Sequence, residues 1–118
     1  MPPTHPLTSS TDPLPPSEVR FLETRVEPWA DGQRVRVHVT LTPFQQRPNL
    51  EARILDQEGR LLSQADIIET MNARLVFTMH LRAAEPQGPF RLEISLTYEN
   101  SGQIDHRTVD FTLEDAQN

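Results

Sequence analysis

The sequence contains no cysteine and no lysine, and glycine occurs only four times among 118 residues. The absence of cysteine excludes disulfide bonds, zinc sites built from thiolates and catalysis by a cysteine nucleophile. The absence of lysine excludes enzymes that form a Schiff base through a lysine side chain. Four scattered glycines also exclude a glycine-rich loop that cradles phosphate groups. The chain therefore cannot be an enzyme that uses a cysteine nucleophile, a lysine Schiff base or a glycine-rich phosphate loop.

The length and the charge balance narrow the function further. A chain of 118 residues has the size of one domain. Eleven arginines face 17 acidic residues, and a formal net charge of -6 is unfavourable for contact with nucleic acid. No apolar run approaches the roughly 20 residues of a membrane span, and residues 1–7 have no basic segment of the kind that opens a signal peptide. We therefore expect a cytoplasmic protein that binds neither nucleic acid nor a membrane.

The eleven prolines fall into two groups. Six of them lie within residues 1–17, together with serines and threonines and few large apolar side chains. Such a segment buries too little surface to offset the entropy of ordering, so we predict a disordered tail over 1–17 and one folded domain over 18–118. The other five prolines lie at the expected margins of strands or in loops, where a missing N–H breaks no ladder.

Alternation of apolar and polar residues dominates the chain after the tail. Residues 35–42 read VRVHVTLT, and residues 90–98 alternate equally strictly. This period of two is typical of strands with one buried and one solvated face. We predict seven strands, over about 19–27, 33–42, 49–56, 60–68, 74–83, 89–99 and 103–114. Each of the four glycines lies between two of these strands, where a tight turn needs a positive φ.

Seven strands of this length indicate an all-β fold, a seven-stranded antiparallel sandwich of two sheets. The alternation slips beside Phe21 and again between Ile104 and Val109, and we predict a β-bulge in an edge strand at each place. Residues 64–73 fit a strand followed by a loop, and a short helix is the alternative there. Strand count, turn spacing and alternation over residues 18–114 resemble the immunoglobulin-like sandwiches, including the fibronectin type III-like ones.

The resemblance implies a fold and no binding site. The chain lacks the two cysteines of antibody domains, and its single tryptophan, Trp29, precedes the second strand rather than lying in the third. Tyr98 stands at the end of the sixth strand and does not match a tyrosine corner. Since no residue of a family site has a counterpart here, function has to be argued from the residues themselves.

The candidate catalytic and metal-binding residues form no complete site. His38 and His80 occupy outward positions on strands that neighbour each other in such a sandwich, within about 5 Å in a matching register, but a zinc site needs three or four protein ligands. Ser95, His106 and Asp110 share the outer face of the last hairpin in a regular register, yet a flat strand face offers neither an oxyanion hole nor a cleft. We therefore predict that the chain is not an enzyme, with no catalytic residue, no metal site and no cofactor.

Five residues are candidates for partner binding. Phe44 and Arg47 lie in the polar loop after the second strand, and aromatic residues and arginine are the usual anchors of protein interfaces. The alternative interpretation is that Phe44 packs back onto the end of the core. Met71 lies in a turn that we expect at the same end of the sandwich. Leu55 and Leu62 fall on outward positions around the turn between the third and fourth strands, where they mark an exposed apolar patch or an edge that dimerises.

These observations predict a non-enzymatic protein-interaction or structural module that binds another protein or, as a homodimer, a second copy of itself. The alternative is a sandwich that binds a small ligand or a carbohydrate at one loop end. That alternative needs exposed aromatic side chains, and it loses its best residues if Phe44 and Trp29 both prove fully buried. We expect Trp29 to close the core at the end opposite to Phe44.

Overall fold

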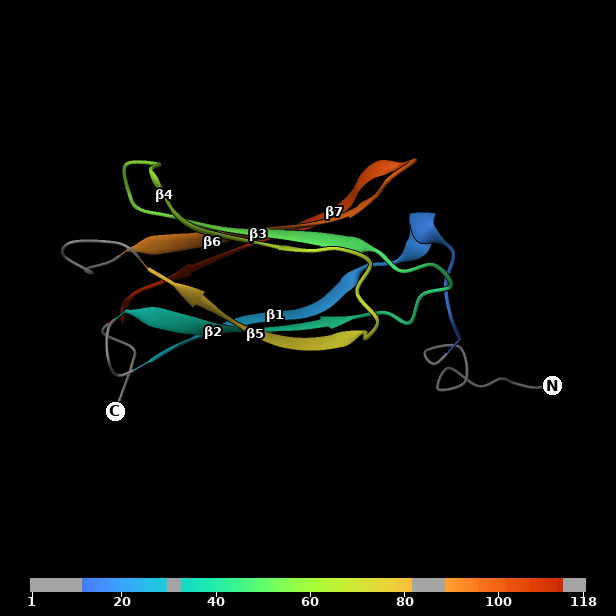
Figure 1. The fold of residues 1–118 in the computed structure, drawn as a ribbon, viewed down its shortest axis with the longest axis horizontal. Helices are drawn as coiled ribbons and strands as arrows, with labels where there is room; N and C mark the ends of the chain where they lie inside the picture. The colour runs from blue at the N-terminus through green and yellow to red at the C-terminus, as the bar shows by residue number, and fades with distance from the viewer. Residues whose placement is uncertain (1–11, 30–32, 82–88, 114–118) are drawn as a thin grey trace.

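The computed structural model describes residues 12–29, 33–81 and 89–113, and within them seven antiparallel strands form two packed sheets (Figure 1). The strands are β1 (Phe21–Pro28), β2 (Arg34–Leu41), β3 (Asn49–Leu55), β4 (Leu61–Ile67), β5 (Arg74–His80), β6 (Phe90–Tyr98) and β7 (Gly102–Phe111). A short 3-10 turn, η1 (Pro16–Glu18), precedes β1. One sheet has the order β1-β2-β5 and the other the order β4-β3-β6-β7, so β1, β5, β4 and β7 are the edge strands. This is the all-β two-sheet sandwich that the alternation predicts.

The core lies between the two sheets and is built by the inward rows of the strands. Every second residue of β2 from Val35 to Leu41 is buried, and so is every second residue of β6 from Phe90 to Tyr98. Three residues of the edge strands β5 and β7 are partly buried and pack against this core: Leu75, Phe77 and Val109. Because successive side chains of a strand point to opposite faces, the period of two in the sequence determines which face is dry.

Three of the four edge strands contain a shift of register within the described residues. β1 shifts between Phe21 and Glu23 and β7 shifts at Ile104, which confirms the two predicted bulges. A third shift, which the alternation does not predict, lies at the start of β4, where Leu62 is the extra residue opposite the Ile54–Leu55 step of β3. β5 pairs with β2 without any shift. Bulges discourage pairing with another chain, so β5 is the least protected edge.

Two of the predicted glycine turns lie in the described residues, and the other two glycines lie outside them. Gly59 has φ 86° and Gly102 has φ 71°, values that residues with a side chain rarely adopt. Asp56 builds the turn before Gly59, because its carboxylate accepts the backbone N–H groups of Arg60 and Glu58. These hydrogen bonds, that from Arg60 foremost, hold the pKa of Asp56 below its ordinary value. The turn chemistry read from the sequence is confirmed at both places.

The described part of the predicted tail contacts the sandwich. Leu14 forms an isolated parallel bridge with Phe44, in which its N–H donates to the carbonyl of Pro43 at 3.0 Å and its carbonyl accepts the N–H of Gln45 at 2.9 Å. The Leu14 side chain also packs against the core. Burial of this side chain and two backbone hydrogen bonds offset the entropy of ordering the segment. Leu14, which we predicted to lie in the tail, therefore contacts the sandwich. Residues 1–11 of the predicted tail lie outside the described residues.

Candidate functional site

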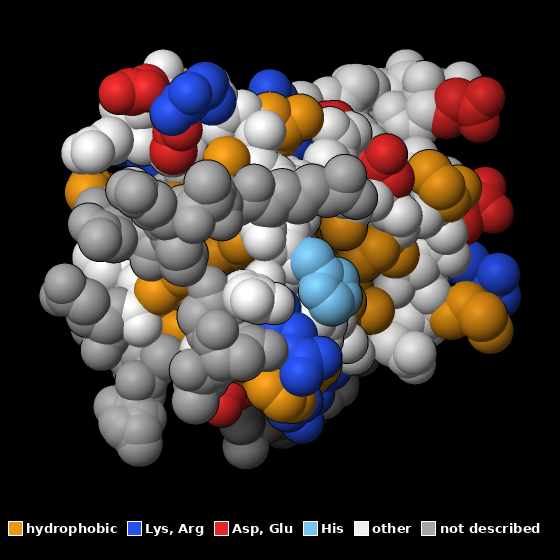
Figure 2. Space-filling model, turned by 60° about the vertical axis from the view of Figure 1, so that its left-hand side comes forward, with side chains coloured by type: hydrophobic (Ala, Val, Ile, Leu, Met, Phe, Trp, Pro, Cys, Tyr) orange, Lys and Arg blue, Asp and Glu red, His pale blue; other side chains and the backbone are white. Residues whose placement is uncertain are grey.

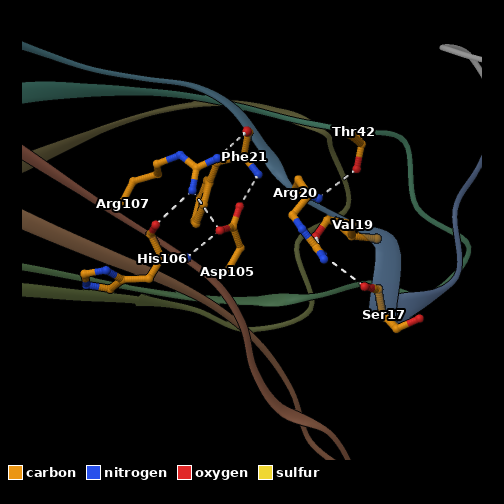
Figure 3. Close-up of polar contacts among 8 residues, drawn as sticks. All are labelled: Ser17, Val19, Arg20, Phe21, Thr42, Asp105, His106 and Arg107. Carbon is orange, nitrogen blue, oxygen red and sulfur yellow. Dashed lines mark hydrogen bonds and ion pairs between the residues drawn. The ribbon is translucent and has the colours of Figure 1, made fainter.

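The two long sides of the sandwich differ, and one of them is closed by the edge strands β1 and β7. Asp105 of β7 joins these strands (Figure 3). Its carboxylate accepts the backbone N–H of Phe21 at 2.9 Å, and it also accepts the N–H of His106 and the guanidinium of Arg107 at 2.8 Å each. The side chain is only 13% exposed. The bulge at Ile104 turns Asp105 toward the other sheet, so a charged group bridges the two edges.

The pKa of Asp105 reflects this position. Burial raises the pKa, but the hydrogen bonds from Phe21 and His106 together with the charge of Arg107 outweigh burial, so the pKa lies below its ordinary value. Arg107 also lies over the ring of Phe21, with 6.0 Å between its guanidinium carbon and the ring centroid. The ionised carboxylate is engaged on all sides by donors of its own chain. Asp105 is therefore a structural link between the sheets.

On the opposite side, the edge strands β4 and β5 leave a groove between the sheets. The groove has a volume of about 380 Å³ and is lined by residues 61–65 of β4 and 78–80 of β5. Leu62 packs against the core from β4, and the buried Met79 reaches the groove from β5. Figure 2 looks onto the end of the sandwich where β4 begins and β5 ends, and it shows hydrophobic side chains gathered beside a histidine. Most inward residues of these two edge strands are thus only partly buried, unlike the central rows of the core.

Large apolar side chains are exposed along the same side. In the described residues five large hydrophobic side chains are exposed, and four of them belong to β4, to β5 or to the connection between these strands. These four are Leu61 at 49%, Ile68 and Met71 at 71% each, and Val76 at 55% exposed. Exposed apolar residues that lie along one side of a molecule favour an interaction surface more than residues scattered over all sides do. We call the groove and these four residues the open side.

The loops expected at one end of the sandwich do lie together. The backbone N–H of Thr70 donates to the carbonyl of Pro48 at 3.0 Å, which joins the 68–73 connection to the loop after β2. The hydroxyl of Tyr98 donates to the carbonyl of Gln46 at 2.8 Å, which joins the same loop to the end of β6. The 68–73 connection is a loop rather than the short helix that was the alternative. These contacts place the loop after β2, the 68–73 connection and the end of β6 side by side at one end of the sandwich, as predicted.

Three candidate partner-binding residues lie at this end. Phe44 is half-buried and packs against the core, which confirms the alternative interpretation of that residue. Arg47 is exposed on the loop, and Met71 is exposed on the neighbouring connection as expected. Only Met71 therefore belongs to the open side. A role of these residues in binding a partner stays a prediction.

Of the two candidate leucines near the turn between β3 and β4, Leu55 lies on the outward row of its strand as predicted, and Leu62 does not. Leu62 was expected to face outward, and this is wrong, because it packs against the core. The cause is the bulge at the start of β4, which turns Leu62 inward and leaves its neighbour Leu61 exposed instead. Leu55 is partly buried and lines a separate hollow of about 460 Å³, together with Phe90 and Arg91 of β6. The structure does not bring Leu55 and Leu62 into one outward patch.

Trp29 does not close an end of the core, as we expected, but lies on the outer face of the three-stranded sheet. Its N–H donates to the carbonyl of Arg34, which extends the pairing of β1 with β2 and places the ring among outward residues. The guanidinium carbons of Arg34 and Arg36 lie 4.3 and 4.9 Å from the ring centroid. The ring is partly exposed and borders a shallow hollow of about 320 Å³ with Glu27 and Arg36. Neither Trp29 nor Phe44 is fully buried, so the ligand-binding alternative keeps its best residues.

The histidines of β2 and β5 are not brought together. In the observed register His38 lies opposite Val76 and His80 lies opposite Arg34, so the matching register considered above is wrong. Four residues along a strand span about 13 Å, which separates the two rings. His38 instead pairs with Glu27 at 2.9 Å, and this hydrogen bond holds the pKa of Glu27 below its ordinary value. Within the described ranges, no group of three or more potential metal ligands occurs.

The three residues of the last hairpin are only partly neighbours. Ser95 and His106 lie opposite each other on β6 and β7. Asp110 lies four residues further along β7, about 13 Å away, and its carboxylate pairs with Arg91 at 3.0 Å. In the described part of the chain, Asp110 is therefore not placed to form a relay through His106 to Ser95. Among the residues that the structure describes, no helix is long and apolar enough to cross a membrane.

Comparison with known proteins identifies similar folds only. A scan against known protein families finds no match, and no curated protein matches the sequence. Solved structures do match: a glycosyl hydrolase family 2 member from Bacteroides cellulosilyticus covers 80% of this chain with a TM-score of 0.65 at 15% identity. A β-glucuronidase from Bifidobacterium dentium covers 80% with a TM-score of 0.62 at 16% identity, and one from Ruminococcus gnavus in complex with D-glucuronic acid covers 81% with a TM-score of 0.53 at 18% identity.

The matched region is a small part of each of these glycosidases. The alignment spans 14%, 18% and 16% of the three chains respectively. At such low identity the likeness shows a shared β-sandwich fold and nothing of the activity.

Proposed function

We propose that this chain is a non-enzymatic β-sandwich module that binds a protein through its open side. The observation that carries the proposal is the asymmetry of the sandwich. β1 and β7 are joined by Asp105, whereas β4 and β5 leave a groove lined by both apolar and polar side chains, and the exposed Leu61 and Val76 lie on these two strands. An unprotected edge strand beside apolar side chains is a template for another strand or for a complementary surface.

Two further observations support a binding role over a catalytic one. The candidate catalytic residues are dispersed, since His38 is engaged by Glu27 and Asp110 by Arg91. The solved structures that share the fold are much longer than this chain, so in them a sandwich of this kind is one part among others. A part of that kind is suited to making contacts between proteins or domains.

We also infer that the sandwich is of the immunoglobulin-like type. β1, β2 and β5 share one sheet and β3, β6 and β7 share the other, as strands A, B, E and C, F, G do in immunoglobulin domains. β4 lies beside β3 instead of completing the first sheet, which departs from the constant-type arrangement. The strand order supports the resemblance that alternation and turn spacing indicate.

Photo-cross-linking in cells that produce the full chain tests the binding role. Val76 on β5, which is 55% exposed, is replaced by benzoylphenylalanine, and irradiation is expected to trap a protein on the open side. Leu22 on β1 is the matched control, because it is 64% exposed but lies on the opposite edge of the same sheet. The cross-linked species are separated by electrophoresis and identified by mass spectrometry. No product from position 76, or equal yields from positions 76 and 22, would contradict the proposal.

A second function, carbohydrate binding, is favoured by Trp29. A partly exposed ring beside a shallow hollow with a few polar groups is a common element of small-ligand sites. Arg34 and Arg36 add guanidinium groups, which suit a carboxylate, and a solved structure with the same fold is a β-glucuronidase bound to D-glucuronic acid. The hollow on this face therefore fits an acidic sugar best.

For this second function we expect D-glucuronic acid to shift the amide NMR signals around Trp29 in the full chain. Trp29→Ala should weaken binding by about tenfold, equivalent to about 1.4 kcal/mol, because the ring surface is lost. Phe44→Ala, at another aromatic residue away from the hollow, should leave the affinity unchanged. The absence of any shift at millimolar sugar, or equal weakening by both variants, would exclude the site.

A further inference from the structure

The open side has a shape and a charge pattern that fit one particular partner. Resting on the proposed function, we infer that this partner is a second copy of the chain, related by a two-fold axis parallel to the strands. β5 of each copy then pairs with β4 of the other. The sheets join end to end in the order β1-β2-β5 followed by β4-β3-β6-β7 of the second copy. Both open edges of both copies are satisfied in one closed dimer.

The strand directions allow this pairing. The six residues 68–73 connect β4 to β5 at one end of the sandwich, so the two strands run in opposite directions (Figure 1). A two-fold rotation about the strand direction leaves that relation unchanged, and β5 therefore meets β4 of the second copy antiparallel. The same rotation places the two 68–73 connections at one end of the dimer. The exposed Ile68 and Met71 of both copies then gather there.

The backbone of β5 offers the hydrogen-bonding groups that an added strand needs. The carbonyl of Ala73 accepts the N–H of Leu41 in β2, the N–H of Leu81 donates to the carbonyl of Gln33 just before β2, and the pairing between these two bonds has no shift. Antiparallel strands alternate between residues that bond to the neighbour and residues that point away. The N–H and C=O groups of Val76 and Thr78 therefore point to the free edge. Unlike the other three edges among the described strands, this one has no bulge to block a partner, and the bulge of β4 lies at its first residues, so residues 63–67 of β4 remain regular for pairing.

The charges on β4 and β5 are complementary between copies. Glu51 of β3 and Asp66 of β4 lie directly opposite each other, and like charges in this position are destabilising. Only the neutral amide of Gln64 lies between them, at 3.1 Å from Glu51 and 3.4 Å from Asp66. On β5, the exposed side chain of Arg74 makes no hydrogen bond or ion pair with any described residue. An Arg74 opposite the partner's Asp66 supplies the missing positive charge.

The register that pairs these two charges also matches side-chain size. With Arg74 opposite the partner's Asp66, the exposed Val76 lies opposite the partner's Gln64 and is covered. On the inner face, a large side chain meets a small one at each step: Leu75 meets Ala65, Phe77 meets Ser63, and Ile67 meets Ala73. The groove between β4 and β5, to which Leu62 and Met79 contribute apolar lining, is closed by the second copy. Alternation of large and small side chains is what close packing between two faces requires.

The mass of the full chain in solution, measured by size-exclusion chromatography with light scattering, tests the dimer. We expect twice the 13.5 kDa of the chain at high concentration. Thr78→Pro removes an edge-facing N–H without removing a bond to β2, and should weaken the dimer by about 100-fold or more. Leu22→Lys on the opposite edge is the control and should leave the dimer intact. A wild-type monomer at every soluble concentration would overturn the inference.

A charge exchange tests whether β5 meets β4 rather than another β5. Arg74→Glu alone and Asp66→Arg alone should each weaken the dimer by about tenfold, because each sets like charges opposite each other at two symmetric places. The double variant Arg74→Glu/Asp66→Arg restores opposite charges and should recover most of the affinity. These two residues are exposed, so the variants fold even if Thr78→Pro does not. A double variant as weak as the single ones would overturn the pairing of β5 with β4.

The cross-linking described above separates this inference from the proposed function. A product of twice the chain mass from position 76 supports both. A product with another protein, from a chain that is monomeric in solution, leaves the proposed function standing and overturns the dimer. If irradiation yields no cross-linked product from position 76, both the dimer and the proposed binding function are contradicted.

Discussion

Asp105→Ala is expected to lower the free energy of unfolding by about 2–4 kcal/mol at neutral pH. The substitution removes the acceptor for the N–H of Phe21 and for the guanidinium of Arg107, at a position where the side chain is only 13% exposed. A hydrogen bond to a charged group contributes about 1.5–3 kcal/mol, and a buried donor left without a partner costs about 1–3 kcal/mol. Urea unfolding followed by circular dichroism measures the loss.

The pH dependence of the free energy of unfolding tests whether the charge of Asp105 causes this stabilisation. Its pKa is lower in the folded than in the unfolded chain, so the carboxylate adds stability that is complete above the unfolded pKa of about 3.9 and is lost as the pH falls through the folded pKa. The difference between wild type and Asp105→Asn should therefore be largest near neutral pH and shrink in acid. Asp110→Ala breaks an exposed pair with Arg91, worth about 0–1 kcal/mol. The structural link would be contradicted if the substitutions at positions 105 and 110 lowered the free energy of unfolding equally. It would also be contradicted if the difference between wild type and Asp105→Asn did not change with pH.

Most of the fold was predictable from the sequence because burial in a sandwich repeats with a period of two. The inward rows must be apolar throughout, while the outward residues are free to vary, and this contrast predicts both the strands and their faces. The turns were predictable because Gly59 and Gly102 take a positive φ that few other residues tolerate. Even two bulges leave a trace, since the alternation slips at Phe21 and Ile104 where the register shifts.

Features that depend on the pairing of distant residues were not predictable. Leu61 and Leu62 are both leucine, so the alternation cannot indicate which of them faces inward at the third bulge. His38 and His80 share a face, but the register of β2 with β5 separates them by four residues. Trp29 follows the expected end of a strand, and only the pairing of that strand with β2 places its ring on the outer face. Register is a property of two strands together, which no single strand reveals.

The open side was visible in the sequence only in part. Met71 was among the candidate residues because it is a large apolar side chain in a turn. Val76 and Ile68 were missed, since an apolar residue on an outward position is common, and only the sheet order makes β5 an edge. One signal was present: Leu75, Val76 and Phe77 form an apolar run that breaks the alternation of the fifth strand on its outer face. The outward valine in that run belongs to the surface that we propose a partner covers.

Leu92→Ala is expected to cost about 2–5 kcal/mol and to lower the unfolding temperature by on the order of 10–30 °C. Leu92 is fully buried and lies between Ile54 of β3 and Val109 of β7, where the alanine leaves a cavity that flanking strands cannot close. Differential scanning calorimetry measures the shift. Leu22→Ala is the matched control, the same substitution at a side chain that is 64% exposed, and should change stability by less than about 0.5 kcal/mol.

The contrast between these two leucines also supports the test of the dimer. If stability lies in the inner faces of the sheets, substitutions at exposed positions of β5 such as Arg74 leave the fold intact, and their effect on association reports the edge alone. Leu92→Ala should then lower the unfolding temperature while the protein that remains folded still dimerises, because Leu92 lies on β6, which is not an edge strand and is separated from β4 by β3. Similar losses for Leu92→Ala and Leu22→Ala would mean that the inward rows do not form the core. Loss of dimer in folded Leu92→Ala would mean that the open side is not the interface.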